Sequence, residues 1–463
     1  MLTDDVSQSD WEKLQFYGSH IRWLCMHCLP WRANDFHRRR SIAPSTWTTI
    51  SHLTSGAPLL PNLYELVYRW DSPNSSEILH IVPPTLSRLH ITEIPDAVTG
   101  ALNSNSRQEW EASFRMLLST LFSKTPHLKS LALGARDFLP GSISSPIVKL
   151  SGLRDFTLCF NSADVNTLRV LAALPDLRAM RLDGINVASE MDPIPSSFPH
   201  LEVLRIAEHP TTNRFYEAFF PLRLTDLTIS RYPGHLSFRH TCEAWARSCP
   251  SLQAIKCMVD DPEFIPRNWN AQPISHVIKP LFSISTMVSF TLEFAEGHFV
   301  VLDHDILEIS AAWPSLKKLH LYYTCIDPSP QSYASGTQPV PQNPGVASLL
   351  CLAVQMPHLL TLTLTGLEIR GFPQSQIERL PVCDHSLAHL TVGRVKADDI
   401  ASVAVIVDRL FPHLHIPPTG EGVFMEAEVK QLWHTVWACQ MARRQQEQRG
   451  RTAAISFAQT ARR

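Results

Sequence analysis

The tripeptide Pro-x-Leu recurs along the whole chain and usually opens a short apolar run of the form Leu-x-x-Leu-x-Leu. Such runs begin at Leu128, Leu201 and Leu316, where they read Leu-Lys-Ser-Leu-Ala-Leu, Leu-Glu-Val-Leu-Arg-Ile and Leu-Lys-Lys-Leu-His-Leu. Alternation of apolar and other residues is typical of a β-strand that is buried on one face. Proline cannot continue a helix and favours extended geometry in the residue before it. Each unit therefore predicts a helix that ends before a proline, followed by a strand.

The unit recurs at a regular distance in the middle of the chain. The first apolar residues of four successive units are spaced by 24, 24 and 23 residues, at Leu153, Leu177, Leu201 and Leu224. One leucine-rich repeat has about 20–29 residues. Elsewhere the spacing is wider, which longer helices or loops accommodate. The pattern predicts an α/β leucine-rich-repeat solenoid of irregular repeat length, with a curved parallel sheet inside and helices outside.

Helical patterns precede several of the predicted strands. Asp164 is expected to cap a helix in which one face carries Val165, Leu168, Leu171 and Leu174. Further helices are expected over residues 109–123, 241–248 and 303–312. Within each strand, the leucines should point into the core between sheet and helices, and the residues between them should point to the concave side.

The chain divides into four expected segments. Residues 1–50 form a helical cap or linker, 51–418 the solenoid, 419–442 a capping helix and 443–463 a disordered basic tail. The capping helix is indicated by apolar residues on one face, namely Val429, Leu432, Trp433 and Val436.

A proline-rich loop is expected within one repeat, at residues 327–345. The segment from Pro341 to Pro344 fits the PxxP recognition pattern, but its composition favours a solvated insertion.

Composition argues against several classes of partner and location. The formal net charge of −2 disfavours a protein that binds nucleic acid or an anionic membrane, because both require a basic surface. The longest apolar stretch, residues 400–407, is too short to span a bilayer, and the acidic first residues do not resemble a signal peptide. The ten cysteines are scattered singly, apart from one pair, which indicates buried thiols and a cytoplasmic or nuclear protein.

A single CxxC pair, Cys25 and Cys28, lies near His20 and His37. Four ligands, usually from two such pairs, form a structural zinc site, and a second pair is missing from the sequence. We therefore favour packing of both cysteines inside an N-terminal helix.

A second candidate for metal binding is the acidic pair Asp303 and Asp305. It lies where a helix should begin, and carboxylates there cap free amides and oppose the helix dipole. Capping is the favoured interpretation. Nucleotide-binding, hydrolase and metalloprotease motifs are absent from the sequence. We expect a protein that is not an enzyme, with no catalytic residue, cofactor or metal.

The concave residues between the core leucines form a mixed polar surface. Arginine and tyrosine are among the residue types that most often anchor protein interfaces. For any single residue an ordinary solvated position is favoured, so the hypothesis concerns the surface as a whole. Its best candidate anchors for a protein partner are Arg181, Arg205, Lys256, Lys318, His320 and Tyr322.

Four phrases resemble the fungal F-box/leucine-rich-repeat proteins. They are Leu-Pro-Asn-Leu at 60–63, Glu-Ala-Trp-Ala-Arg-Ser-Cys-Pro-Ser-Leu at 243–252, Ile-Ser-Ala-Ala-Trp-Pro-Ser-Leu-Lys-Lys-Leu at 309–319 and Leu-Phe-Pro-His-Leu at 410–414. The resemblance covers roughly residues 11–450. It implies that the repeats hold a protein to be ubiquitinated, while an F-box docks on the adaptor of a Skp–cullin ligase. An F-box is not visible here, because Leu29-Pro30 is followed by Trp-Arg-Ala-Asn.

Three functions remain open. The first is substrate recognition in an F-box-type cullin ubiquitin ligase receptor that lacks its F-box in this chain. Its partners would be an unknown target protein and, if an F-box is encoded upstream, a Skp-type adaptor and a cullin. The second is a free-standing interaction scaffold without a ligase role. The third is a repeat-fold GTPase regulator, which would require a catalytic Arg or Asn at a repeat edge.

Overall fold

The computed structural model describes most of the chain, namely residues 8–26, 44–70, 77–93, 104–134, 141–186, 198–208, 221–233, 238–260, 272–294, 299–323, 343–415 and 426–460. Contacts group the chain into two compact units, Met1–Ile229 and Ser230–Arg463.

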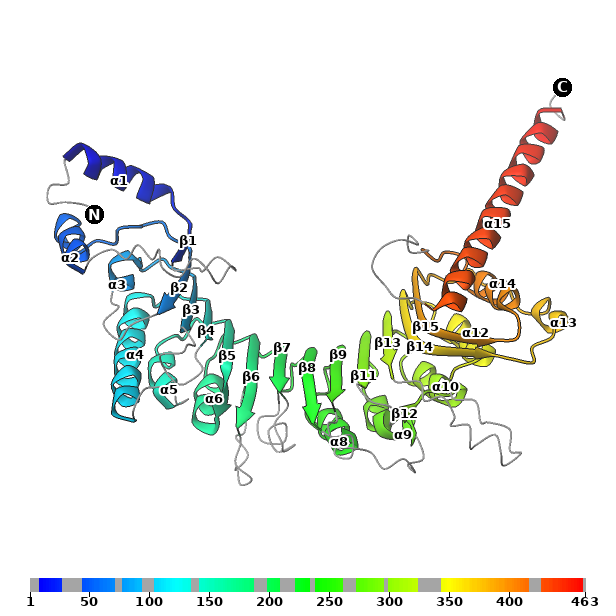
Figure 1. Ribbon diagram of the computed structural model, residues 1–463, viewed down its shortest axis with the longest axis horizontal. Coiled ribbons are helices and arrows are strands. Elements are labelled where there is room, and N and C mark those ends of the chain that lie inside the picture. The colour runs from blue at the N-terminus through cyan, green and yellow to red at the C-terminus, as the bar shows by residue number, and fades with distance from the viewer. Residues whose placement is uncertain are drawn as a thin grey trace. The chain divides into compact units, whose positions relative to one another are not determined.

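Among the described residues, thirteen strands form a parallel sheet whose order follows the chain (Figure 1). The first unit contains β1 (Trp23–Met26), β2 (Glu65–Trp70), β3 (Arg88–Glu93), β4 (Ser130–Gly134), β5 (Asp155–Asp164), β6 (Ala179–Asn186) and β7 (Val203–Glu208). The unit boundary falls within β8 (Asp226–Pro233). The second unit contains β9 (Ala254–Asp260), β11 (Ser289–Phe294), β13 (Lys318–Tyr322), β14 (Thr361–Ile369) and β15 (His389–Ala397). Two short strands, β10 (Gln272–Pro273) and β12 (Phe299–Val300), pair separately.

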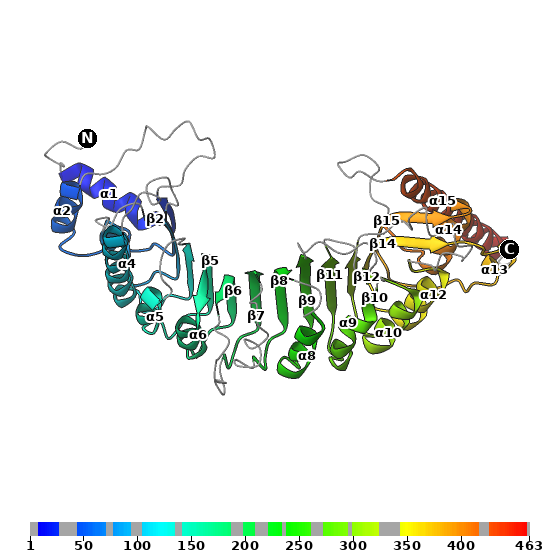
Figure 2. The same cartoon turned by 60° about the horizontal axis from the view of Figure 1, so that its bottom comes forward.

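Most strands of the sheet follow a described helix, and within each unit most of these helices lie against one side of the sheet (Figures 1 and 2). In the first unit they are α1 (Gln8–His20), α2 (Pro44–Leu53), α3 (Ile78–Ile81), α4 (Ser104–Lys124), α5 (Gly141–Ile147) and α6 (Val165–Ala172). In the second they are α8 (Phe238–Ser248), α9 (Ile274–Ile278), the 3₁₀-helix η3 (Lys279–Ser283), α10 (Asp303–Ala312), α12 (Val346–Gln355), α13 (Gln374–Ile377), α14 (Ile400–Leu410) and α15 (Ala427–Thr460). The predicted leucine-rich-repeat solenoid is confirmed.

The core consists of leucines and other apolar residues that stack laterally from strand to strand. Phe156 is the register partner of Met180, and Met180 is that of Leu204; all three are buried. Leu319 and Leu321 in β13 are fully buried as well. The predicted orientation is confirmed, because the residues between them face the other side of the sheet, as the exposed Arg205 does.

In most of the described repeats, one carbonyl joins the repeat to the next one. The oxygen of Lys129 accepts hydrogen bonds from the amides of Arg154 at 2.8 Å and Asp155 at 3.0 Å. In the second unit, the oxygen of Lys317 accepts from the amides of Leu360 at 2.8 Å and Thr361 at 3.0 Å. This arrangement aligns the start of each strand with the start of the preceding one.

The predicted helices are present. The expected segment 303–312 coincides with α10, and those at 109–123 and 241–248 lie within α4 and α8. Asp164 caps α6, since its carboxylate accepts a hydrogen bond from the amide of Thr167 at 2.7 Å.

The N-terminal segment differs from the expectation of a helix around Cys25. This residue lies in strand β1, where its register partner is Val67, and it is disulfide-bonded instead of being a free thiol. The interpretation was wrong because β2 would otherwise leave its backbone unpaired at the edge of the sheet. The segment around Cys25 pairs with this edge as strand β1. Cys28 and His37 lie outside the described residues. The other described cysteines are free, at 159, 242, 249, 257, 351, 383 and 439.

The C-terminal segment contains the predicted capping helix, α15, with Val429, Leu432, Trp433 and Val436 all buried. The expected disorder from residue 443 is not observed, because α15 continues to Thr460. The reason is local: glutamine, glutamate, arginine and alanine, which fill this stretch, are good helix formers.

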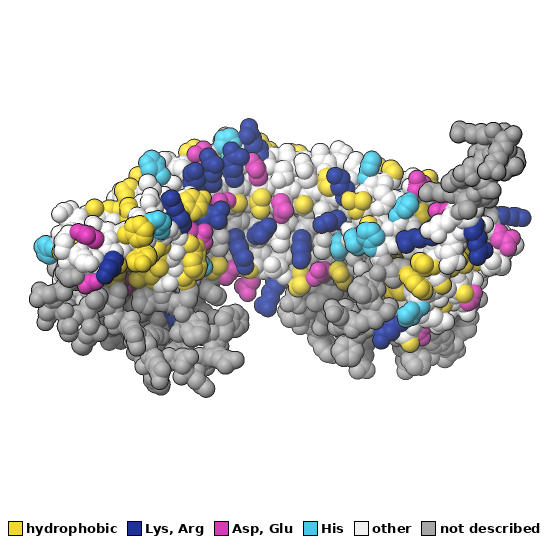
Figure 3. All heavy atoms as spheres, turned by 90° about the horizontal axis from the view of Figure 1, so that it is seen from above, with side chains coloured by type: hydrophobic (Ala, Val, Ile, Leu, Met, Phe, Trp, Pro, Cys, Tyr) yellow, Lys and Arg dark blue, Asp and Glu magenta, His cyan; other side chains and the backbone are white. Residues whose placement is uncertain are grey.

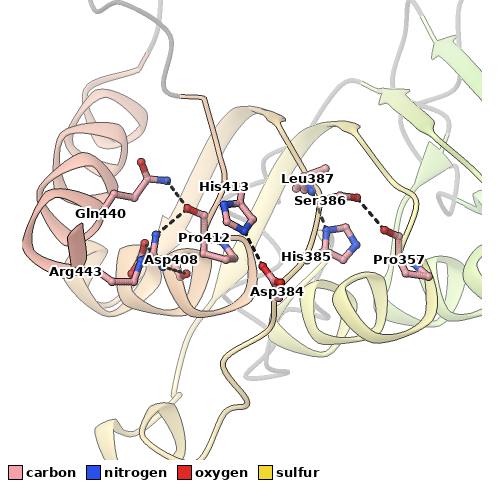
Figure 4. A network of polar contacts seen from close by, with 10 residues as sticks. All are labelled: Pro357, Asp384, His385, Ser386, Leu387, Asp408, Pro412, His413, Gln440 and Arg443. Atoms are coloured by element: carbon pink, nitrogen blue, oxygen red, sulfur yellow. Dashed lines mark hydrogen bonds and ion pairs between the residues drawn. The ribbon is translucent and has the colours of Figure 1, made fainter. Parts of the chain in front are cut away.

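Contacts with the last repeat fix the first part of α15 (Figure 4). The side chain of Gln440 donates to the carbonyl of Leu414 at 3.2 Å, and Arg443 donates to the carbonyl of Pro412 at 2.7 Å. Arg443 also lies 3.2 Å from a carboxylate oxygen of Asp408. The helix thereby satisfies carbonyls at the end of the solenoid. Of the predicted loop 327–345, residues 327–342 lie outside the described residues.

The strand orientation predicts opposite outcomes for two neighbouring residues. Leu204→Asp should lower the free energy of unfolding by about 4 kcal/mol or more, because it buries an unpaired carboxylate in the core. Arg205→Ala should change it by about 0.5 kcal/mol or less. Urea unfolding followed by circular dichroism measures both, and equal losses would mean that the strand faces are reversed.

Candidate functional site

In the first unit, the candidate anchors Arg181 and Arg205 stand side by side. They are register partners on β6 and β7, and both are exposed on the side of the sheet away from the core. Thr157 precedes them in the same row on β5. The structure thus brings together two arginines that are 24 residues apart in the sequence.

In the second unit, the outward residues form two rows across five strands, which we call the donor rows. Register pairing aligns the first row as Ala254, Ser289, Lys318, Thr361 and His389. It aligns the second row as Lys256, Thr291, His320, Thr363 and Thr391. The candidates Lys256, Lys318 and His320 therefore belong to one surface.

The donor rows share a chemical character. Every position except Ala254 carries a side chain that can donate a hydrogen bond, and no position in either row is acidic. Lys256 and Lys318 are exposed. Tyr322 follows in a third row, 40% exposed, as the register partner of Glu293. Figure 3 shows lysine, arginine and histidine side chains on the surface of the second unit.

His320 lies near the middle of the donor rows, half-buried between neighbouring strands. Its Nδ1 is 3.1 Å from the hydroxyl of Thr363. Burial lowers the pKa of His320, Lys318 and Lys256 lower it further, and Glu293 opposes them. The imidazole is therefore neutral at neutral pH, and it offers hydrogen bonds while the two lysines supply the charge.

Sequence reasoning missed His389 and Thr391 among the outward residues. The signal was available, since Leu387-Ala-His-Leu390-Thr-Val392 repeats the strand pattern without its proline. The ring of His389 lies 5.2 Å from that of His415, between centroids.

The acidic pair in α10 caps helices, as expected, but its two members cap different ones. Asp305 is fully buried; it accepts from the amide of Leu302 at 2.7 Å and from that of Ser275, in α9, at 2.9 Å. Asp303 accepts from the amide of Gly345 at 2.7 Å, at the start of α12. The pair therefore ties three helix N-termini together.

Other groups considered for chemistry have structural surroundings. Burial raises the pKa of the Cys249 thiol to about 12, the opposite of what a nucleophilic thiol requires. Within the described ranges, no group of three or more His, Cys, Asp or Glu residues is placed to hold a metal ion. Among the described helices, none combines the length and the apolar composition that crossing a bilayer requires.

His385 connects two repeats of the second unit (Figure 4). It is buried, its Nε2 lies 2.8 Å from the carbonyl of Met356, and its Nδ1 accepts from the amide of Leu387 at 3.0 Å. Burial lowers its pKa, opposed by the hydrogen bond to Met356. Its geometry requires the neutral ring, because a protonated Nδ1 cannot accept.

Comparisons with known proteins identify no family for the chain. No protein-family model and no curated protein matches it. Among solved structures, it is similar to an internalin from Listeria monocytogenes, with 14% identity and a TM-score of 0.41, over 78% of this chain and 92% of that one. It is also similar to the leucine-rich-repeat domain of APL1B, with 13% identity and a TM-score of 0.39, over 92% and 96% of the two chains. The fold assignment rests on the chain's own strand register and core.

The capping role of Asp305 predicts a loss of stability in Asp305→Asn. The amide side chain has one acceptor oxygen for two main-chain amides, so one of them faces an NH₂ group. The free energy of unfolding should fall by about 1–3 kcal/mol in urea titrations. The neighbouring His304→Ala, at an exposed position, should change it by about 0.5 kcal/mol or less. Equal effects would contradict the capping role.

His385 predicts a dependence of stability on pH. Its pKa in the folded protein is lower than the ordinary value of 6.5, so its contribution is present above pH 6.5 and is lost as the pH falls from 6.5 through the folded pKa. The stability advantage of the native protein over His385→Gln should shrink when thermal unfolding is repeated at decreasing pH. The measurement covers pH 7.5 to pH 5.5, roughly one unit either side of the ordinary pKa of 6.5. A stability advantage that stays constant over this range would refute the lowered pKa of His385.

Proposed function

We propose that the chain binds another protein through the face of its repeats that the described helices leave uncovered. The observation that supports this most is the pair of donor rows, in which ten outward positions on five strands are in register. Parallel strands stacked in a solenoid present a broad surface suited to an extended partner. The first unit contributes its own outward arginines, Arg181 and Arg205.

We propose more specifically that it is the substrate-recognition part of an F-box-type cullin ubiquitin ligase receptor. The support is the resemblance of residues 243–252 and 309–319 to fungal F-box/leucine-rich-repeat proteins. Each phrase covers the end of a helix, α8 or α10, and the turn that leads to the next strand. A receptor of this kind positions its target, while other subunits carry out the transfer. A cytoplasmic or nuclear location belongs to the same proposal. The alternative is an interaction scaffold without a ligase role.

Affinity capture from cells with the tagged full-length protein tests the binding role. The variants Arg181→Glu/Arg205→Glu and Lys256→Glu/Lys318→Glu reverse charge on the outward face of the first and second unit. Arg379→Glu reverses an exposed charge beside α13, in the helical layer, and serves as the matched control. We expect at least one partner to be lost from a face variant and retained by the control. Retention of every partner by both face variants would refute the proposal.

The same capture tests the ligase role. Recovery of a Skp-type adaptor and a cullin with the native full-length protein would support it. Their consistent absence, with other partners recovered, would favour the scaffold.

A further inference from the structure

We propose that the donor rows of the second unit bind an extended, acidic segment of the partner protein. The inference rests on the proposed function and adds the chemistry of what is bound. It draws on described residues of β9, β11, β13, β14 and β15, all within one unit.

The charge of the donor rows favours an acidic segment. Lys256 and Lys318 are exposed, and among the described residues no carboxylate forms an ion pair with either of them. Lys317, also exposed, lies at the edge where the strands begin. Among the described outward residues of these strands, a carboxylate next to the rows is that of Glu293, which stands beside Tyr322 in the row that follows. The positive potential of such a surface attracts carboxylates and repels basic segments.

The polar groups of the donor rows suit a segment that is rich in hydrogen-bond acceptors. Carboxylate oxygens accept hydrogen bonds and, when ionised, make stronger bonds than neutral acceptors. The donor rows offer ammonium groups from two lysines, hydroxyls from Ser289, Thr291, Thr361 and Thr391, and two imidazoles. Thr363 is buried, and its hydroxyl contacts His320 within the row. An apolar segment would cover these groups without pairing them, which costs free energy for each group left unsatisfied.

The width of the donor rows fits a short extended segment. Neighbouring strands lie about 4.8 Å apart, so five strands span about 19 Å, and an extended chain covers that distance with about six residues at ~3.3 Å each. Single-stranded nucleic acid would require aromatic side chains on which its bases stack. Tyr322 is the one such side chain, histidine aside, among the described residues of the donor rows and the row that follows them. A protein segment therefore fits better than a nucleic acid.

The test is a titration of the purified full chain by fluorescence anisotropy. One labelled peptide of about ten residues, longer than the span of the rows, alternates Asp and Glu with Ser; a matched peptide has Asn and Gln in place of the acids. We expect the acidic peptide to bind at least about tenfold more tightly than the matched peptide. High salt should weaken the binding of the acidic peptide.

Variants locate the binding on the surface. Lys256→Glu and Lys318→Glu should each weaken binding of the acidic peptide about tenfold or more, because each replaces an attractive charge with a repulsive one. Thr391→Val, which keeps the shape and removes a hydroxyl, should weaken it about threefold. Arg379→Glu has the same charge change away from the rows and should bind like the native protein. Circular dichroism confirms that each variant remains folded.

Three outcomes would overturn the inference. They are equal affinity for the two peptides, equal loss in Arg379→Glu and Lys318→Glu, and tighter binding of a single-stranded oligonucleotide than of the acidic peptide. If Lys256→Glu/Lys318→Glu loses partners in cells while the acidic peptide does not bind, the inference fails and the proposed function stands. If both face variants retain every partner, the proposed function itself fails.

Discussion

A shared main-chain acceptor connects successive repeats, and the placement of every outward residue depends on it. In the first unit the oxygens of Ser87, Lys129, Arg154, Arg178 and Glu202 each accept from two successive amides of the following repeat. In the second unit those of Gln253, Val288, Lys317 and Leu360 do the same. Because the bond uses only the backbone, the side chain at this position is unconstrained, and the register is kept while the sequence varies.

The register has consequences on both sides of the sheet. On the core side it stacks Leu66, Leu89 and Leu131 in line, so that burying one apolar residue depends on its neighbours in the adjacent repeats. Helix N-termini are linked in the same way, since Asp305 bonds to amides of α9 and at the start of its own helix. On the outward side the same register aligns the donor rows.

The sequence predicted the buried residues more completely than the residues on the outward face. The alternation of leucines identified buried positions such as Leu204 and Leu319, because burial on one face imposes a period of two. Sequence reasoning placed Cys25 in a helix, since pairing at a sheet edge leaves no local pattern. It ended the last helix too early, since it gave more weight to the scarcity of apolar residues after Arg443 than to the helix propensity of the residues there. It also overlooked His389, where the strand lacks the proline that precedes most of the others.

The sequence by itself determined the repeat, the helix-then-strand order and the side of the sheet that each strand residue occupies, because these follow from local periodicity and from proline. Tertiary structure alone decided which residues stand beside one another. Lys256, His320 and Thr391 come from repeats of different lengths, so no fixed spacing relates them. Hydrogen bonds between repeats align them, since each strand takes its position from the strand before it and not from the length of the intervening chain.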